Sequence, residues 1–383
     1  MTKASETEVK DDTLSDIFTA GVDGFGSYRI PALLRTSKNR LLAFCEARSI
    51  LSDHAQNKIV VKISEDDGQS WGAQILVADA GENALNNPLV VEDTKSGDII
   101  IMYQEYPLTS ADDVDDPEQW ISHAGQNFPS NVHEGAVQDG YEGRICRSYV
   151  KRSQNQGQTW SEASEVTRQV KRPKEVTCYA GGPGSGIQLQ TGIHKGRIVM
   201  PFTQGPWDNM KVYAVYSDDG GFKWQYGPTA PADIDAHANE TQIAEMANGH
   251  ILLNARSFKG NKRRKLCVSQ NGGHSWSALT DAADLIEPEC QASIIRFDAV
   301  NNETYLVYCG PEHQDERCNG TLKLSKDMAQ TWIDAGSVYT GFFAYSSICQ
   351  LNPSEIGVLF ERDEYRCISF KKVSVAPIAS SSI

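Results

Sequence analysis

The sequence predicts an all-β protein, a six-bladed β-propeller of four-stranded antiparallel sheets with Asp-box turns. Three observations favour this fold. A short motif that ends in tryptophan occurs five times, strands of alternating character precede its copies, and the composition is typical of β structure. The chain of 383 residues has 31 glycines, 14 tyrosines and 7 tryptophans, which are many aromatic residues for a helix-rich protein. The motif is the strongest of these signals.

The repeated motif reads S-x-D/N-x-G-x-x-W. Its copies lie at residues 64–71, 153–160, 217–224, 269–276 and 325–332, and the last copy has alanine in place of glycine. An Asp or Asn oxygen accepts hydrogen bonds from the backbone N–H groups that follow it, and glycine permits positive φ. The tryptophan then covers the turn with its apolar face. Each copy therefore predicts a hairpin turn of the Asp-box kind.

The spacing of the copies predicts the number of blades. Successive tryptophans of the motif are 89, 64, 52 and 56 residues apart, near the length of a four-stranded blade with variable loops. Five marked units in this length suggest six blades, one of them unmarked, in a ring that both chain ends close. We expect a single propeller over residues 17–374, with flexible segments at 1–16 and 375–383.

Charge and composition argue against several classes of function. With 36 Lys and Arg against 50 Asp and Glu, the net charge of −14 disfavours nucleic acid or an anionic membrane as the main partner. No apolar run approaches the roughly 20 residues that cross a bilayer, and residues 1–16 lack the apolar segment of a signal peptide. Nine scattered cysteines, an odd number without metal-ligand spacing, favour a reducing compartment. We expect a cytoplasmic monomer, with secretion after removal of a leader as the alternative.

Arginines stand beside apolar strands in three separate parts of the chain. Arg29 precedes one such strand, Arg256 ends another, and Arg317 precedes a third. A propeller brings strand ends together at its axis, where guanidinium groups would form a fork-shaped site for a carboxylate. Motifs for phosphate, zinc or a nucleophile elbow are absent, and the glycine-rich segment 182–186 predicts a close approach of two strands.

With these motifs the sequence resembles the exo-sialidase (neuraminidase) family, over about residues 18–370. The resemblance rests on the Asp boxes in register and on the segments Tyr28-Arg29-Ile30-Pro31, Glu46-Ala47-Arg48 with Asp53, 182–189, Asn239-Glu240-Thr241-Gln242, Asn254-Ala255-Arg256-Ser257 and Ala344-Tyr345-Ser346-Ser347. It implies that Arg29, Arg256 and Arg317 bind the carboxylate of sialic acid. Glu361 would hold Arg29 in place, and Arg48 and Asp53 would lie near O4 and the glycosidic oxygen.

The resemblance also implies a retaining glycosidase mechanism with a tyrosine nucleophile. In this assignment Tyr345 is the nucleophile, Glu240 is the base that takes its proton, and Asp53 is the acid and base at the glycosidic oxygen. A neutral phenol approaches the anomeric carbon without the repulsion that a carboxylate nucleophile would meet there. The acid role requires a raised pKa of Asp53, for which desolvation under bound substrate is the expected cause.

Each of these three residues also has a structural interpretation. The alternatives are a core position for Tyr345, a turn-capping role for Asp53 and an ion pair with a nearby arginine for Glu240. Asn87, Trp120 and Phe202 are candidates for the pocket that would accept the acyl group of the sugar.

The residues together predict an exo-α-sialidase, a glycoside hydrolase that removes terminal sialic acids from glycans, glycoproteins or glycolipids. The alternatives use the same residues on a deaminated sialic acid, or transfer the sugar to another sugar. A propeller that binds sialic acid without catalysis is less favoured, because such a protein would not need to retain the tyrosine, the glutamate and the three arginines together. We expect no metal or organic cofactor, since three fixed cations neutralise the carboxylate.

Overall fold

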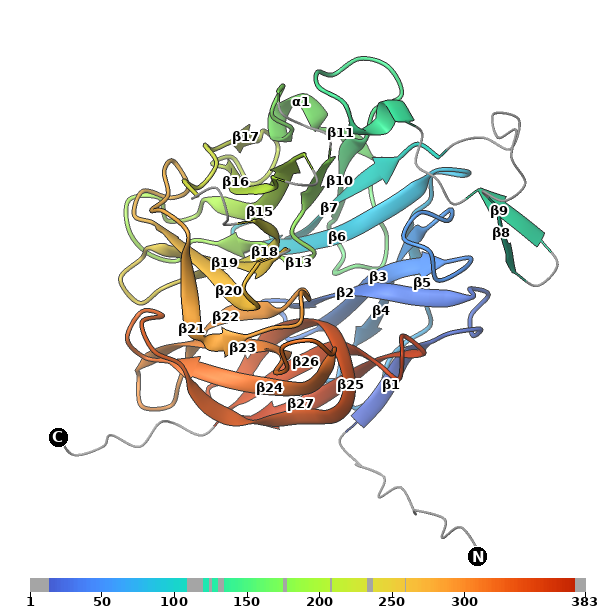
Figure 1. The fold of residues 1–383 in the computed structure, drawn as a ribbon. Helices are drawn as coiled ribbons and strands as arrows, with labels where there is room; N and C mark the ends of the chain where they lie inside the picture. Colours follow the sequence, from blue (N-terminus) through green and yellow to red (C-terminus); the bar gives the residue numbers. More distant parts are fainter. Residues whose placement is uncertain are drawn as a thin grey trace, which may run out of the picture.

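The computed structural model describes residues 14–108, 120–123, 126–129, 134–174, 178–206, 209–232, 237–258 and 260–375. These residues form an all-β fold in which small, mainly antiparallel sheets are arranged as in a propeller (Figure 1). The short helical segments are η3 (Glu134–Val137) and α1 (Thr167–Val170). No helix in the described part of the chain has the length and apolar character needed to span a membrane.

The first sheet contains β2 (Ser27–Arg35), β3 (Leu41–Arg48), β4 (Lys58–Ser64) and β5 (Ile75–Ala78). The second contains β6 (Ala84–Asp93), β7 (Asp98–Tyr106), β10 (Arg147–Ser153), β11 (Ser164–Glu165) and β13 (Gly184–Ser185). The third contains β12 (Cys178–Gly181), β14 (Ile187–Gln188), β15 (Ile198–Gly205), β16 (Lys211–Ser217) and β17 (Gln225–Tyr226).

The fourth sheet contains β18 (Ala238–Glu245), β19 (Ile251–Ser257), β20 (Arg263–Ser269) and β21 (Thr280–Ile286). The fifth contains β1 (Leu14–Thr19), β22 (Ser293–Asp298), β23 (Thr304–Pro311), β24 (Cys318–Ser325), β25 (Ile333–Asn352), β26 (Glu355–Arg362) and β27 (Cys367–Ser374). A separate ribbon is formed by β8 (Trp120–His123) and β9 (Gln126–Pro129).

The prediction of six separate four-stranded blades is wrong in number. Within the described residues there are four separate sheets of four or five strands, one sheet of seven strands and the ribbon. The seven-stranded sheet exists because β25 is continuous over 20 residues. Up to Phe342 this strand pairs with β24, and from Phe343 onward it pairs with β26. A motif that marks turns could not reveal that one strand joins two groups of strands.

Apolar side chains fill the spaces between neighbouring sheets. One buried cluster joins the first sheet to the second, another the second to the third, and further clusters join the third to the fourth and the fourth to the fifth. The last cluster packs β26 and β27 against β2 and β3, so that the fifth sheet meets the first. Because no sheet buries both of its faces alone, the clusters hold the sheets in a ring.

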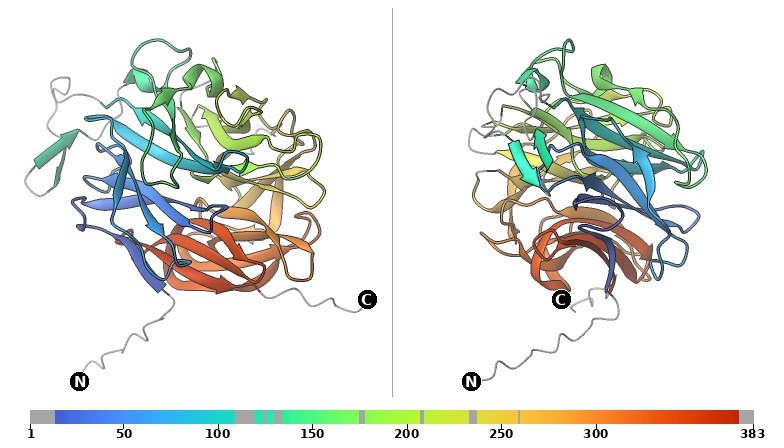
Figure 2. Two further views of the ribbon diagram at one scale, coloured as in Figure 1. Left: turned by 180° about the vertical axis from the view of Figure 1, so that it is seen from behind. Right: turned by 90° about the vertical axis from the view of Figure 1, so that its right-hand side faces the viewer.

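The two ends of the described chain close this ring (Figures 1 and 2, blue beside red). Strand β1 pairs antiparallel with β27, and Asp16 accepts hydrogen bonds from Arg362 and Ser369. The predicted boundaries need correction at both ends. Leu14 to Asp16 belong to a strand rather than to a flexible segment, and Val375 is buried with its N–H bonded to the carbonyl of Ser354.

The predicted turn is present at all five copies of the motif. In the first copy Asp66 accepts a hydrogen bond from the N–H of Ser70, and Ser64 Oγ accepts one from the N–H of Gly68. The other four copies repeat both bonds. In the last copy Ala329 adopts the positive φ, +68°, that the other copies assign to glycine.

The glycine-rich segment makes the close approach that was predicted. A Cβ at Gly182 would lie 1.9 Å from the carbonyl oxygen of Thr241 in β18, so the backbones touch directly. Gln242 and Gln291 both donate to the carbonyl of Pro183. This contact fixes β18, which carries Glu240, against the middle of the ring.

Candidate active site

A cavity of about 520 Å³ contains most of the predicted residues. Its walls come from the first four sheets and from β25, and they include Arg48, Asp53, Asn87, Glu240, Arg256 and Tyr345. Apolar side chains of Tyr106, Met210 and Phe258 form another part of the wall. A pocket of this size that combines apolar walls with convergent polar groups is typical of small-molecule sites.

Tyr345 lies at the centre of the polar groups and is 6% exposed. Its hydroxyl donates a hydrogen bond to Oε1 of Glu240. Arg256 Nη1 donates to Oε2 of Glu240 at 2.6 Å and to the Tyr345 hydroxyl at 3.2 Å. Burial and the adjacent Glu240 raise the pKa of Tyr345 well above its usual value, although Arg256, Arg317 and Arg29 oppose the shift. The phenol is therefore neutral and hydrogen-bonded to a carboxylate.

Arg29 is held from behind by a buried carboxylate. Glu361, which is fully buried, accepts Arg29 Nε at 2.7 Å and the N–H of Ile30 at 2.8 Å through Oε1. Its other oxygen accepts the N–H of Tyr345 at 3.2 Å. The guanidinium carbon of Arg29 lies 5.2 Å from the centre of the Tyr345 ring and 4.1 Å from that of Tyr365. One carboxylate thus fixes both the arginine and the backbone of the tyrosine.

Arg317 approaches the same tyrosine from another side. Its Cζ lies 5.5 Å from the centre of the Tyr345 ring. Nη1 donates to the hydroxyl of Tyr365 at 2.8 Å, and Nη2 donates to the carbonyl of Glu289 at 3.2 Å. Because Tyr365 contacts both Arg29 and Arg317, it spaces the two guanidinium groups. The three predicted arginines therefore converge on Tyr345, from β2, from β19 and from the turn before β24.

Arg48 and Asp53 lie together at the side of the cavity. The buried Arg48 donates to Glu46 through Nε at 2.8 Å and to Asp53 Oδ1 through Nη1 at 2.9 Å. The carbonyl of Asp53 accepts the side-chain amides of Asn57 and Asn86 at 2.6 and 2.8 Å. These bonds fix the loop after β3, while the Asp53 carboxylate remains 71% exposed.

The electrostatic surroundings of Asp53 favour its charged form when no substrate is bound. Loss of hydration acts to raise its pKa, but Arg48 and Arg29 outweigh that effect, and the pKa lies below its usual value. Arg29 Nη1 is 3.8 Å from Asp53 Oδ1. The neighbouring His54 contacts the ring of Tyr106, with centroids 4.9 Å apart. Burial lowers the pKa of His54 to about 4, despite the nearby Asp53, so this imidazole is neutral at pH 7.

Irregularities in the strands aim the site residues inward. The register shifts in β2 between Arg29 and Ala32, in β18 between Ala238 and Thr241, and in β25 between Phe343 and Ser346. These interruptions coincide with Ile30, with Glu240 and with Tyr345. Ile30 has φ of +61°, a strained conformation for a β-branched residue. Bulges commonly redirect side chains beside functional sites, which is their effect here.

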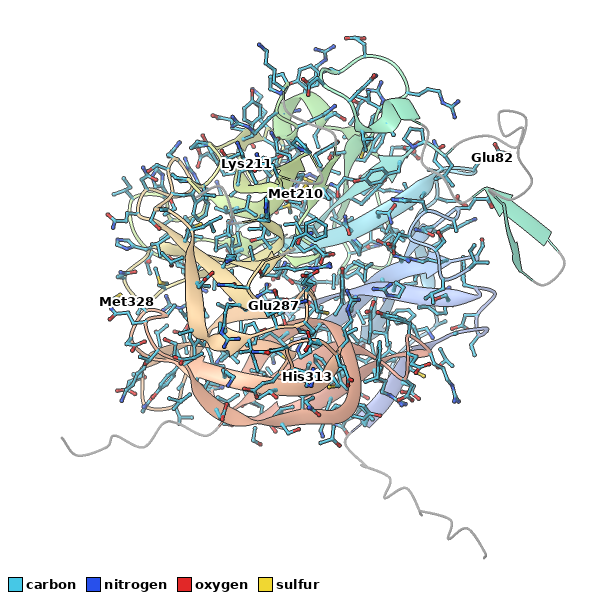
Figure 3. All side chains as sticks on the ribbon, viewed as in Figure 1. Glu82, Met210, Lys211, Glu287, His313 and Met328 are labelled. Atoms are coloured by element: carbon cyan, nitrogen blue, oxygen red, sulfur yellow. The ribbon has the colours of Figure 1, made fainter. Side chains whose placement is uncertain are left out.

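A buried ion pair supports the backbone behind two of the arginines. Glu287 accepts the N–H of Ser257, next to Arg256, at 2.7 Å, and the N–H of Cys290 at 2.8 Å. Arg264 lies 3.8 Å from Glu287 and donates to the carbonyl of Cys290 at 2.7 Å. Glu287 lies near the middle of the molecule in Figure 3. The pair thereby connects β19 to the turn whose Glu289 carbonyl accepts Arg317.

The structure brings together all eight predicted residues: Arg29, Arg48, Asp53, Glu240, Arg256, Arg317, Tyr345 and Glu361. Of the pocket candidates, Asn87 lines the cavity and Phe202 does not, because Phe202 is fully buried and packs on Tyr213. The side chain of Trp120 lies outside the described residues.

The prediction from sequence missed Glu46, Tyr365 and Glu287. The pairing of Glu46 with Arg48 had a signal, since residues two apart share one face of a strand. No local signal marks Tyr365 or the ion pair of Glu287 with Arg264, because these contacts join residues that are distant in sequence.

Comparison with known proteins gives the family. The BNR repeat-like domain family matches residues 39–358, which is most of the chain. The chain belongs to this BNR repeat-like family. A sialidase of Micromonospora viridifaciens is 29% identical to this BNR repeat-like protein over 361 residues, covering 91% of the chain. The chain spans 52% of that relative's length.

Solved structures agree in fold. A Hadza microbial sialidase superposes on the BNR repeat-like protein with a TM-score of 0.80 and 24% identity, covering 94% of this chain and 68% of the other. A leech intramolecular trans-sialidase gives a TM-score of 0.74 at 18% identity, covering 94% and 70%. With the family match, these similarities confirm the resemblance to the exo-α-sialidase family.

Proposed function

We propose that the protein is an exo-α-sialidase, a retaining glycoside hydrolase that releases terminal sialic acids from sialylated glycans, glycoproteins or glycolipids. The observation that carries the proposal is the position of Tyr345, whose hydroxyl bonds to Glu240 while three arginines lie around its ring. A neutral nucleophile among fixed positive charges suits an anomeric carbon that bears a carboxylate.

The first step forms a bond between the Tyr345 oxygen and the anomeric carbon. The phenolic proton passes to Glu240, which already accepts it in a hydrogen bond. The bond from the anomeric carbon to the leaving oxygen breaks, and Asp53 supplies the proton to that oxygen. Arg29, Arg256 and Arg317 hold the substrate carboxylate, so the nucleophile and the carbon meet in a fixed orientation.

The second step reverses these roles. Asp53 takes a proton from a water molecule, whose oxygen attacks the anomeric carbon as the bond to Tyr345 breaks. Glu240 returns its proton to the phenolate. Two displacements at one carbon retain its configuration, so the first product is the α-anomer. Arg48 would orient Asp53 and contact O4 of the sugar, which its buried position beside the cavity supports.

A second candidate is transfer of the sugar within the substrate or to another sugar. The similarity in fold to a leech intramolecular trans-sialidase, solved with 2,7-anhydro-Neu5Ac, supports testing it. Both reactions share the first step, and they differ in the group that attacks the tyrosyl intermediate. A deaminated sialic acid is a further alternative substrate. The part of the cavity that would accept the acyl group determines which of the two sugars is preferred.

The test uses a panel of chromogenic glycosides of N-acetylneuraminic acid, its deaminated analogue and neutral hexoses, with proton NMR of the products. The proposal expects turnover of the sialosides only, with the α-anomer as the first product. An anhydro sugar or a glycosylated acceptor as the main product would replace hydrolysis by transfer. Binding without turnover, or the β-anomer as first product, would overturn the mechanism.

A further inference from the structure

The turn that carries Arg317 also gathers three side chains with metal-ligating atoms. His313, Glu316 and Cys318 lie between β23 and β24, and their ligand atoms all lie within 4.8 Å of one another. Glu316 is exposed, and the other two side chains are half-buried, so an ion can reach them from solvent. His313 is labelled on this hairpin in Figure 3. None of the three takes part in the site described above.

The chemistry of the three donors indicates the class of ion. An imidazole nitrogen, a carboxylate oxygen and a thiolate sulfur are the donors that zinc accepts, at about 2.0–2.3 Å. Calcium and magnesium prefer sites made of oxygen alone. Zinc binds cysteine as the thiolate, so an ion at this turn would displace the thiol proton of Cys318.

In its present conformation the turn uses His313 in hydrogen bonds that metal binding would break. His313 Nδ1 accepts the N–H of Glu316 at 2.8 Å and that of Asp315 at 3.1 Å. A neutral imidazole has one nitrogen lone pair in the ring plane, so coordination through either nitrogen ends these two bonds. The backbone that they hold immediately precedes Arg317.

Arg317 depends on this backbone for its position. Glu316 and Cys318 flank Arg317 in a tight turn, in which the N–H of Cys318 donates to the carbonyl of Glu316 at 2.9 Å. Arg317 reaches Tyr365 and Glu289 across the cavity side, and its carbonyl accepts the N–H of Phe343 at 2.9 Å. A rearrangement of this turn moves the Cα atom of Arg317. Arg29 and Arg256 lie on other strands and keep their positions.

We propose that His313, Glu316 and Cys318 form a regulatory zinc site that reduces substrate affinity by displacing Arg317. The effect on activity rests on the proposed sialidase function, whereas metal binding does not. Zinc then raises KM more than it lowers kcat, because Tyr345, Glu240 and Asp53 remain in place. A coupling free energy of typical size between the zinc site and the substrate site corresponds to an increase of about fivefold or more in KM.

Metal binding is measured first, on the full chain without reducing thiols. Titration with Co²⁺ is expected to give a thiolate-to-cobalt charge-transfer band at one ion per chain, and Zn²⁺ is expected to remove it. C318S and H313A should abolish the band, and H250A, which changes a histidine on another hairpin, should retain it. Absence of the band from the unmodified chain overturns the site. Should C318S fail to fold, E316Q at the exposed position takes its place with weaker binding expected.

Sialoside turnover is then measured with and without Zn²⁺, followed by a chelator. A reversible rise in KM that C318S lacks supports the regulatory role. Stoichiometric zinc binding with unchanged KM overturns the coupling to Arg317. Absence of turnover in both conditions, with cobalt bound, would sink the sialidase proposal and leave the metal site intact.

Discussion

Glu240 accepts the phenolic hydrogen of Tyr345 on one carboxylate oxygen and Arg256 on the other. Glu240 thus forms the ion pair that was considered as its structural role, and it also contacts Tyr345. The arginine keeps the carboxylate turned toward the tyrosine, and the tyrosine supplies the proton that a base would remove.

The first prediction concerns Y345F. Loss of the phenolic oxygen removes the nucleophile but leaves the arginines and the cavity shape, so kcat falls by roughly 10³-fold or more while binding of a sialic acid analogue changes little. Steady-state kinetics and calorimetric titration measure the two quantities. Y103F, which alters a buried tyrosine in a core between two sheets, serves as the control for folding. Normal turnover by Y345F would refute the assignment.

The second prediction separates two arginines that approach the same tyrosine. Arg317 forms no ion pair with any described residue, so R317A weakens substrate binding by about 10- to 100-fold with little change in stability. R29A has the same effect on binding and also leaves Glu361 buried without its partner, at a cost of about 3–5 kcal/mol in unfolding free energy.

Urea unfolding and kcat/KM measure both variants of this pair. The double variant R29A/E361Q removes the unpaired charge, so it should recover stability but not activity. Equal stability of R29A and the unmodified protein would show that Glu361 is not a charged partner of Arg29.

The third prediction follows from the low pKa of Asp53. In the free protein Arg48 and Arg29 keep this carboxylate ionised, whereas proton donation requires the acid form in the complex. The basic limb of kcat/KM, which reports Asp53 in the free protein, therefore lies at lower pH than the basic limb of kcat, which reports Asp53 in the complex. Complete pH profiles of both parameters check this order.

The leaving group gives an independent check on Asp53. D53N should slow turnover of sialyl-lactose by about 10²- to 10⁴-fold, because the sugar oxygen needs a proton. A nitrophenyl sialoside needs little protonation, so its first step should be nearly unaffected. Equal losses on both substrates would assign Asp53 to binding instead.

The fourth prediction concerns ring closure and pH. Burial acts to raise the pKa of Asp16, but hydrogen bonds from Ser369 and Arg362 outweigh it, and the pKa is lowered. The folded form therefore gains stability above the ordinary Asp value near 4, and this gain disappears as the pH falls through the lower folded value. D16N should lower the urea midpoint at pH 7 and have little effect at a pH below the lowered folded value.

The exposed Glu82 provides the control for that series. Glu82 is exposed and lies outside the pairing of β1 with β27. The urea midpoint of E82Q should therefore equal that of the unmodified protein at both pH values. An unchanged urea midpoint of D16N at pH 7 would show that Asp16 does not stabilise the closure of the ring.

The predictable features of this protein are those with local causes. The Asp-box turns depend on residues within eight positions. The hydrogen bonds of Ser64, Asp66 and Gly68 could therefore be predicted from the sequence motif. The site arginines were found through motif resemblance, since nothing local distinguishes Arg317 from a surface arginine. The continuity of β25, the spacing role of Tyr365 and the Glu287 pair arise from contacts between distant segments, which no sequence window contains.

The pairing of β1 with β27 has a consequence during synthesis. A ribosome makes the first strand long before its partner, and that strand's edge stays open until Cys367 and the residues after it emerge. A translation product that stops earlier cannot complete the circle, however well its other sheets form. Chaperones and proteases would therefore meet a copy that still lacks β27 with one unpaired edge, and synthesis of β27 is the step that allows the ring to close.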